Sequence, residues 1–234
     1  MIDIHSHVLP GIDDGSKSFT MSLEILKGLE EQGITDLICT PHYIVDTNQV
    51  STRANNEKLL EQLQEKAAKK GLKIKLHLGN EIYIDKDIPK LLRLKKASPL
   101  GKNKYLLVEL PMSGEFEQYE DILLNLVQKK WKVILAHPER YHSFQKDYKK
   151  ILDLHQSGIL LQCNLGSFIG QYGRHAKKTA QKIAKDKLIF CTGTDIHRPR
   201  DYEEIAKAQK KLRKYYEFYE LDAILVQNPL KIVQ

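Results

Sequence analysis

The sequence has few of the residues and runs that would place it outside the cell or in a membrane. Its three cysteines stand alone at positions 39, 163 and 191, with no C-x-x-C pair, and an odd number of isolated cysteines argues against a disulfide framework. No apolar run approaches the roughly 20 residues of a membrane helix, and the first residues lack the pattern of a signal peptide. We therefore expect a cytoplasmic protein without membrane insertion, whose three thiols are reduced and buried in strands.

Several catalytic and nucleotide-binding motifs are also absent. Neither a G-x-x-x-x-G-K-[ST] loop nor a G-x-G-x-x-G turn occurs, which leaves little support for a nucleoside triphosphate or dinucleotide site. The C-x5-R loop of the cysteine phosphatases is missing as well, because Arg198 follows Cys191 one residue too late. A reaction through a phosphocysteine is therefore not expected.

The net charge of +7 suits nucleic acid, an anionic surface or a phosphorylated substrate, and charge alone does not choose among them. A site for single-stranded nucleic acid would place stacking aromatic residues among the basic ones. Only "KKLRKYYEFYE" has this character. Helical spacing in that stretch predicts that Tyr215, Phe218 and Tyr219 face the core, so we expect no nucleic-acid partner.

Short apolar runs alternate with amphipathic segments along the chain, which is the pattern of repeated strand–helix units. We expect strands within residues 1–5, 34–40, 72–82, 104–110, 132–138, 159–165 and 188–194. A glycine stands between helix and strand at positions 33, 71 and 158, as in left-handed helix caps. About seven such units fit a closed or nearly closed parallel barrel with outer helices, and a doubly wound open sheet is the alternative. No linker or repeat divides the chain, so we expect one domain over residues 1–234.

Imidazoles and carboxylates stand at the carboxyl ends of the expected strands, and a parallel barrel brings these ends to one mouth. They are His5, His7, Asp14, His42, Glu81, Glu109, His137, Asp195 and His197. Singly, each has an ordinary structural explanation. Together they indicate a metal site, because buried charges are rare unless they are paired or bound to a cation. Histidine and carboxylate without cysteine suit Mn²⁺, Zn²⁺ or Fe²⁺, and the set is large enough for two or three ions.

The motifs "HSHVLPGIDDGSKS", "TPHY", "GNEIYI", "VELP", "AHPER" and "TDIH" follow one another from residue 1 to about residue 197. They resemble the motifs of the PHP (polymerase and histidinol phosphatase) superfamily, and specifically those of the bacterial capsule-operon tyrosine-protein phosphatases of the CpsB/CapC type. The resemblance implies a distorted (β/α)7 barrel and a trinuclear centre usually associated with Mn²⁺. It also implies dephosphorylation of the tyrosine kinase that regulates exopolysaccharide synthesis.

The resemblance further implies how the ligands are divided among three ions. The sets are His5, His7, Glu81 and Asp195 for one ion, Glu81 as a bridge with Glu109 and His137 for a second, and Asp14, His42 and His197 for the third. The chain departs from some relatives at two positions. Tyr43 stands where they carry histidine or a basic residue, and Arg198 stands where asparagine is common.

Hydrolysis of a phosphate ester needs a nucleophile at neutral pH and positive charge around the transferred oxygens. A metal-bound hydroxide would be the nucleophile, and Arg140 in "AHPER" would clamp phosphate oxygens in a bidentate geometry. The alternative for this arginine is a salt bridge at a helix start. The resemblance leaves a second phosphate-binding arginine open between Arg198 and Arg200. We expect Arg140 and Asp195 to be the catalytic residues.

The same metal site would serve a phosphotyrosine phosphatase, a small-molecule phosphatase of the histidinol-phosphate type, or a phosphodiesterase acting on nucleic-acid ends. A non-catalytic, metal-stabilised binding module is a further alternative, and the full set of ligand types speaks against it. We expect phosphotyrosine in a flexible segment of a kinase partner to be the preferred substrate. A phenolate with a pKa near 10 leaves more readily than a serine alkoxide.

Overall fold

The computed structural model describes residues 1–45 and 51–234 of the chain. Its strands pair in parallel around a ring. They are β1 (Ile2–Asp3), β2 (Asp36–Cys39), β3 (His42–Tyr43), β4 (Lys75–Leu78), β5 (Glu81–Tyr83), β6 (Tyr105–Glu109), β7 (Lys132–Ala136), β8 (Leu160–Asn164) and β9 (Ile189–Gly193). β2 continues into β3 and β4 into β5, because Cys39 pairs with Leu78 and His42 with Glu81 at the same offset of 39 residues. Counted in this way, the described strands occupy the seven positions that the sequence predicts.

Backbone contacts between the first and last strand positions join the ring near the carboxyl ends. Ser6 forms a parallel bridge with Ile196, and the amide of Asp195 donates to the carbonyl of His5 at 2.9 Å. This arrangement agrees with a distorted seven-stranded barrel. β1 is shorter than expected and ends at Asp3. The Asp3 carboxylate accepts the backbone N–H of His5 at 3.2 Å, and such a side-chain acceptor competes with the strand ladder for that N–H.

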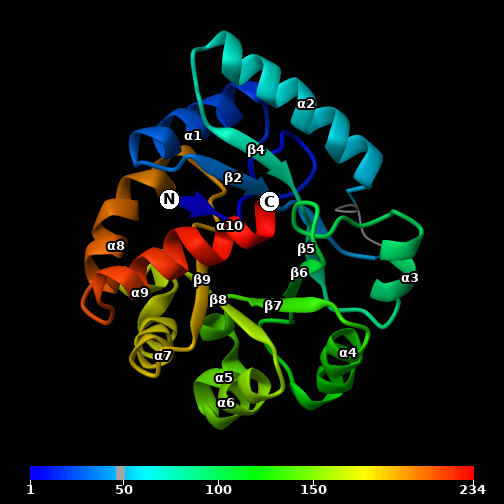
Figure 1. Ribbon diagram of the computed structural model, residues 1–234, viewed down its shortest axis with the longest axis vertical. Helices are drawn as coiled ribbons and strands as arrows, with labels where there is room; N and C mark the ends of the chain where they lie inside the picture. The colour runs from blue at the N-terminus through cyan, green and yellow to red at the C-terminus, as the bar shows by residue number, and fades with distance from the viewer. Residues whose placement is uncertain (46–50) are drawn as a thin grey trace.

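Helices surround the strands (Figure 1). They are α1 (Phe19–Glu31), α2 (Arg53–Lys69), α3 (Ile88–Arg93), α4 (Glu117–Gln128), α5 (His142–Lys146), α6 (Lys149–Gln156), α7 (Gly173–Lys185), α8 (Ile205–Leu212), α9 (Phe218–Asp222) and α10 (Asn228–Val233). Short 3₁₀ turns η1 (Pro138–Arg140), η2 (Leu165–Ile169) and η3 (Pro199–Glu204) follow the last three strands, and the π-helical turn η4 (Ala223–Gln227) precedes α10. α10 covers the amino-terminal end of the ring, where Ile232 packs in the interior. No described helix is long and apolar enough to cross a membrane.

The strands alternate between two apolar cores, as the period of two in a β-strand requires. The interior core contains Ile2, Ile4, Ile38, Leu100, Tyr105, Leu107, Ile134, Ala136, Cys191 and Ile232. Intervening residues such as Leu106, Val108 and Val133 pack outward against the helices. Toward the carboxyl ends of the strands the inward-facing residues become polar. The apolar interior core therefore lies directly below a polar region at the mouth of the ring.

The expectation for the cysteines is confirmed. Cys39, Cys163 and Cys191 lie in β2, β8 and β9, and all three are free and buried. Burial raises the pKa of each thiol above its ordinary range. The thiols are therefore protonated at neutral pH and supply no thiolate nucleophile.

The expectation for the aromatic stretch near the C-terminus is wrong at two positions. Phe218 is 87% exposed and Tyr219 is 73% exposed, whereas Tyr215 packs against the outer core. The helical spacing does not continue through this stretch, because α8 ends at Leu212 and a new helix begins at Phe218. The glycine caps are confirmed, since Gly33, Gly71 and Gly158 all have positive φ.

Candidate metal centre

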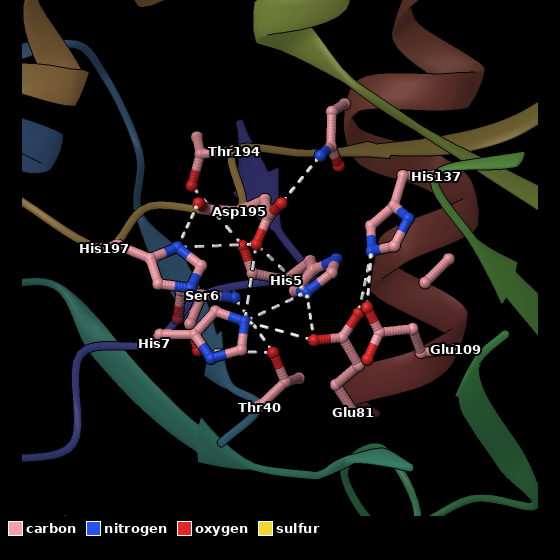
Figure 2. A network of polar contacts seen from close by, with 12 residues as sticks. His5, Ser6, His7, Thr40, Glu81, Glu109, His137, Thr194, Asp195 and His197 are labelled. Carbon is pink, nitrogen blue, oxygen red and sulfur yellow. Dashed lines mark hydrogen bonds and ion pairs between the residues drawn. The ribbon is translucent and has the colours of Figure 1, made fainter. Parts of the chain in front are cut away.

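The predicted ligands converge at the mouth of the ring. Figure 2 shows how His5, His7, Glu81, Glu109, His137, Asp195 and His197 lie there. Four overlapping groups each place their ligand atoms within 4.8 Å of one another. The groups are His7, Asp14, His42 and His197; His5, His7 and Glu81; His5, His137 and Asp195; and His42, Glu81 and Glu109. Among the described residues these groups contain all nine predicted ligands and nothing else. The structure therefore brings all nine residues together. Because several residues belong to more than one group, the groups do not assign each residue to a single ion.

The first two ligands come from the segment that follows β1. The Nε2 atoms of His5 and His7 lie 3.2 Å apart, and both rings are buried. His7 Nδ1 lies 2.9 Å from a carboxylate oxygen of Asp13, so this contact turns Nε2 toward the centre. The loop approaches His7 closely because residue 15 is glycine: a Cβ there would lie 2.1 Å from the His7 carbonyl oxygen.

Glu81 lies at the middle of the site. Its Oε1 is 2.9 Å from His137 Nε2, and its Oε2 is 3.2 Å from the Nε2 atom of both His5 and His7. The carboxylate is buried. A carboxylate with imidazoles on both oxygens has the geometry expected of a bridging ligand.

The open side of the centre is formed by Asp14, His42 and His197. Asp14 Oδ1 lies 3.4 Å from His42 Nε2 and 3.2 Å from His197 Nε2, and the Asp14 side chain is 56% exposed. Hydrogen bonds from His197 and His42 lower the pKa of Asp14. This aspartate stays ionised at neutral pH at the edge where a substrate would enter.

The buried carboxylates repel one another when no cation is present. Burial and the neighbouring Glu81 raise the pKa of Glu109 to about 8. Burial lowers the pKa of His5, but the Glu81 and Asp195 carboxylates outweigh it and raise the pKa overall. Burial also lowers the pKa of His137 to about 4, which keeps that imidazole neutral. A bound cation would therefore reduce the repulsion among the buried carboxylates of the site.

Two ligands have strained backbones. His137 has φ 33° and Asp195 has φ 55°, a left-handed region that costs a non-glycine residue about 1–3 kcal/mol. His137 directly follows β7, and Asp195 follows β9 after one intervening residue. The strained positions therefore coincide with two strand ends that contribute candidate ligands.

Within residues 1–45 and 51–234, three buried polar atoms of the site have no hydrogen-bond partner, namely His42 Nδ1, His137 Nδ1 and Glu81 Oε2. A buried polar atom without a partner costs about 1–3 kcal/mol. Glu81 Oε2 has imidazole nitrogens around it at 3.1 to 3.2 Å, close enough for one cation to bind these atoms together. The nitrogen and oxygen donor set, without sulfur, fits Mn²⁺, Zn²⁺ or Fe²⁺.

Arg140 lies directly beside the predicted ligands. Its Nη1 donates to Asp195 Oδ2 at 2.6 Å, and its guanidinium lies 4.4 Å from the centre of the Tyr172 ring. The side chain is 24% exposed. Arg198 and Arg200, the two other arginines expected to bind substrate, are exposed at the start of η3.

Sequence reasoning missed a layer of residues behind the ligands. Asp13 is bonded to His7, Gln162 to His5 and Asn164 to Asp195. The two amides carried a readable signal, because they are polar residues at i and i+2 of an otherwise apolar strand. Amides are not among the imidazole and carboxylate ligands that indicate such a metal site, so this signal did not mark the two residues as functional.

Comparison with known proteins agrees with this geometry. The family model for capsular polysaccharide synthesis, CpsB/CapC, matches residues 1–234. CapC of Staphylococcus aureus is 30% identical over 98% of this chain and 90% of its own length. The tyrosine-protein phosphatase CpsB of Streptococcus pneumoniae is 27% identical over 100% of this chain and 98% of its own.

Solved structures give the same result. The structures of YwqE from Bacillus subtilis and CpsB from Streptococcus pneumoniae, described as metal-dependent tyrosine phosphatases, match with a TM-score of 0.91 and 26% identity. The match covers 100% of this chain and 94% of the solved one. The phosphotriesterase homology protein of Escherichia coli, at 12% identity, shares the fold with a TM-score of 0.60 over 100% of this chain and 98% of its own. The chain belongs to the CpsB/CapC family.

Proposed function

We propose that this protein is a metal-dependent tyrosine-protein phosphatase that hydrolyses phosphotyrosine in a protein substrate. The relatives named as tyrosine-protein phosphatases match it over nearly its full length. The observation that carries the proposal is the contact of Arg140 with Asp195, at 2.6 Å. In this contact the guanidinium that we propose to bind phosphate lies next to a predicted metal ligand.

The nine residues of the candidate centre are the proposed metal ligands, and Mn²⁺ is the proposed ion, in two or three copies. When bound, such ions lower the pKa of a coordinated water and neutralise charge on the phosphoryl oxygens. The buried donors Glu81, His5 and His7 hold their positions through packing and hydrogen bonds, so little reorganisation is needed. The Asp14 side chain lies at the edge of the candidate centre and is in contact with solvent.

Arg140 is proposed to hold the phosphate. One guanidinium nitrogen is bonded to Asp195, and the planar group lies over Tyr172, which fixes its orientation. The remaining N–H groups of the fork are available to two phosphate oxygens. Arg198 or Arg200 would supply a second contact from the exposed start of η3.

The preference for phosphotyrosine follows from the leaving group. A phenolate, with a pKa near 10, needs less help from a proton donor than an alkoxide does. The thiols supply no alternative nucleophile, because burial raises their pKa values. The proposed partner is an autophosphorylated tyrosine kinase of capsule or exopolysaccharide synthesis, and the net charge of +7 favours a multiply phosphorylated segment.

A panel of substrates tests the proposal. The purified protein is stripped with a chelator, reloaded with Mn²⁺ and assayed on phosphotyrosyl peptide, phosphoseryl peptide, histidinol phosphate and a short oligonucleotide. We expect the highest kcat/KM on the phosphotyrosyl peptide and no turnover in the stripped protein. Faster hydrolysis of histidinol phosphate or the oligonucleotide would contradict the substrate assignment. Full activity in protein shown to be metal-free by elemental analysis would contradict the metal centre.

A further inference from the structure

Strand β8 contributes no predicted metal ligand, yet two of its inward side chains are polar. Gln162 and Asn164 are both completely buried, with 0% exposure. Between them Cys163 packs into the outer core. Two buried amides below a metal centre need a complete set of partners, because each polar atom left without one destabilises the fold.

The two amides form a continuous chain of hydrogen bonds between two predicted ligands. His5 Nδ1 lies 2.9 Å from Gln162 Oε1. Gln162 Nε2 donates to Asn164 Oδ1 at 2.8 Å, and Asn164 Nδ2 donates to Asp195 Oδ2 at 2.8 Å. The chain links the ligand that follows the first strand with the ligand that follows the last.

Chemistry fixes the direction of every bond in this chain. The ionised carboxylate of Asp195 can only accept, so Asn164 must present its NH₂ group to it. The carbonyl oxygen of Asn164 then faces Gln162, which must donate. The carbonyl oxygen of Gln162 faces His5, so the proton of that imidazole lies on Nδ1.

The consequence for the metal centre is specific. With the proton on Nδ1, the lone pair of His5 lies on Nε2, which faces Glu81 at 3.2 Å. Asp195 Oδ2 is occupied by Asn164 and Arg140, so Oδ1 is the oxygen left for an ion. Oδ1 lies 3.5 Å from His5 Nε2.

The backbone leaves room for this arrangement at Gly193 in β9. A Cβ at this position would lie 2.6 Å from His5 Cβ and 3.0 Å from Gln162 Nε2. A residue larger than glycine would push the histidine and the amide apart. The absence of a side chain at Gly193 in β9 therefore allows His5 and Gln162 to contact each other.

We propose that Gln162 and Asn164 are positioning residues that form an amide relay between His5 and Asp195. The relay holds the imidazole in the Nδ1–H tautomer and orients the carboxylate, so that Nε2 and Oδ1 are presented to the metal. The proposal rests on the metal ligation by His5 and Asp195 that is part of the proposed function. It adds that two residues which touch neither metal nor substrate determine the metal affinity.

Titration of the metal-free protein with Mn²⁺ by calorimetry tests the relay. Gln162→Met and Asn164→Leu keep approximate side-chain volume and remove the hydrogen bonds. Each should weaken Mn²⁺ binding about 10- to 100-fold, the usual effect of losing a partner of a metal ligand. Cys163→Ala is the matched control on the same strand and should bind as the wild type does. Gln162→Glu retains the acceptor for His5 but removes the donor to Asn164, so it should also bind Mn²⁺ more weakly than the wild type.

Circular dichroism of the metal-free variants separates affinity from folding. Folded Gln162→Met and Asn164→Leu variants with wild-type Mn²⁺ affinity would overturn the relay. If neither variant folds, ¹⁵N-histidine NMR of the Zn²⁺-loaded wild type decides the question: we expect His5 to be protonated at Nδ1 with the metal on Nε2, and a metal on Nδ1 would overturn it. A wild-type protein that binds no Mn²⁺ would instead contradict the proposed function.

Discussion

Removal of the metal should make the stability of this protein fall as the pH rises, and Glu109 is one identifiable cause. Its side chain is largely buried next to Glu81, and these two effects raise the pKa of Glu109 to about 8. In the unfolded chain the same group titrates near 4.5. Between these pKa values the folded protein holds a proton that the unfolded chain has released, so each pH unit of increase favours unfolding by about 1.4 kcal/mol.

The expected loss from about pH 6.5 to about pH 8 is therefore on the order of 2 kcal/mol from Glu109 alone. Three histidines of the site act in the same direction. The pKa values of His5, His7 and His42 are raised, because neighbouring carboxylates outweigh the effect of burial. Their stabilising protonation is complete below the ordinary histidine pKa of 6.5 and is lost as the pH rises through the folded-state values.

Urea unfolding of the protein in a chelator at the two pH values measures this loss. Glu109→Gln removes the titrating group and should reduce the loss by about 2 kcal/mol, whereas Glu115→Gln, at an exposed position, should leave it unchanged. With saturating Mn²⁺ the trend should reverse, because metal ligands bind in their deprotonated forms. Two results would refute the reasoning. One is equal stability of the metal-free protein at both pH values, and the other is a Glu109→Gln variant that loses as much stability between the two pH values as the wild type does.

Three further predictions concern the reaction and the loop after β1. Serine at all three buried cysteines should leave most of the activity of the folded protein, and a trapped phosphocysteine would contradict the assignment. At saturating Mn²⁺, Arg140→Ala should lower kcat/KM for a phosphotyrosyl peptide about 100-fold, whereas Arg213→Ala, at an exposed position, should have no effect. Gly15→Ala should displace His7 and reduce the bound Mn²⁺ measured by elemental analysis; full Mn²⁺ occupancy would show that the loop can rearrange.

The convergence of the nine candidate ligands could be predicted from the sequence, because a parallel barrel brings residues at the ends of distant strands together in space. Residues such as His5, Glu81 and Asp195 stand where apolar strands end, and the ring brings all strand ends together. Imidazoles and carboxylates at those points therefore predict one site even though they come from distant segments. The strand period and the parallel direction of the strands are sufficient to place these residues together.

Asp13, which lies behind the candidate ligand His7, could not be found in this way. Asp13 binds His7 through a loop whose path depends on the close approach at Gly15, which no periodicity reveals. The early end of β1 depends on a side-chain bond from Asp3. The exposure of Phe218 depends on a break between two helices, where a continuous spacing predicts burial. Each of these features arises from a single local contact or break.

The joining of the first and last strand positions also governs when the centre can exist during synthesis. His5 and Asp195 lie within 3.5 Å of each other although 190 residues separate them in the chain. A ribosome adds on the order of 5–20 residues each second. Many seconds therefore pass between the synthesis of His5 and the synthesis of Asp195. No nascent chain that stops short of His197 contains the full ligand set. A site formed by the nine candidate ligands is therefore complete only after most of the chain has been synthesised, and a chain that ends before His197 lacks part of it.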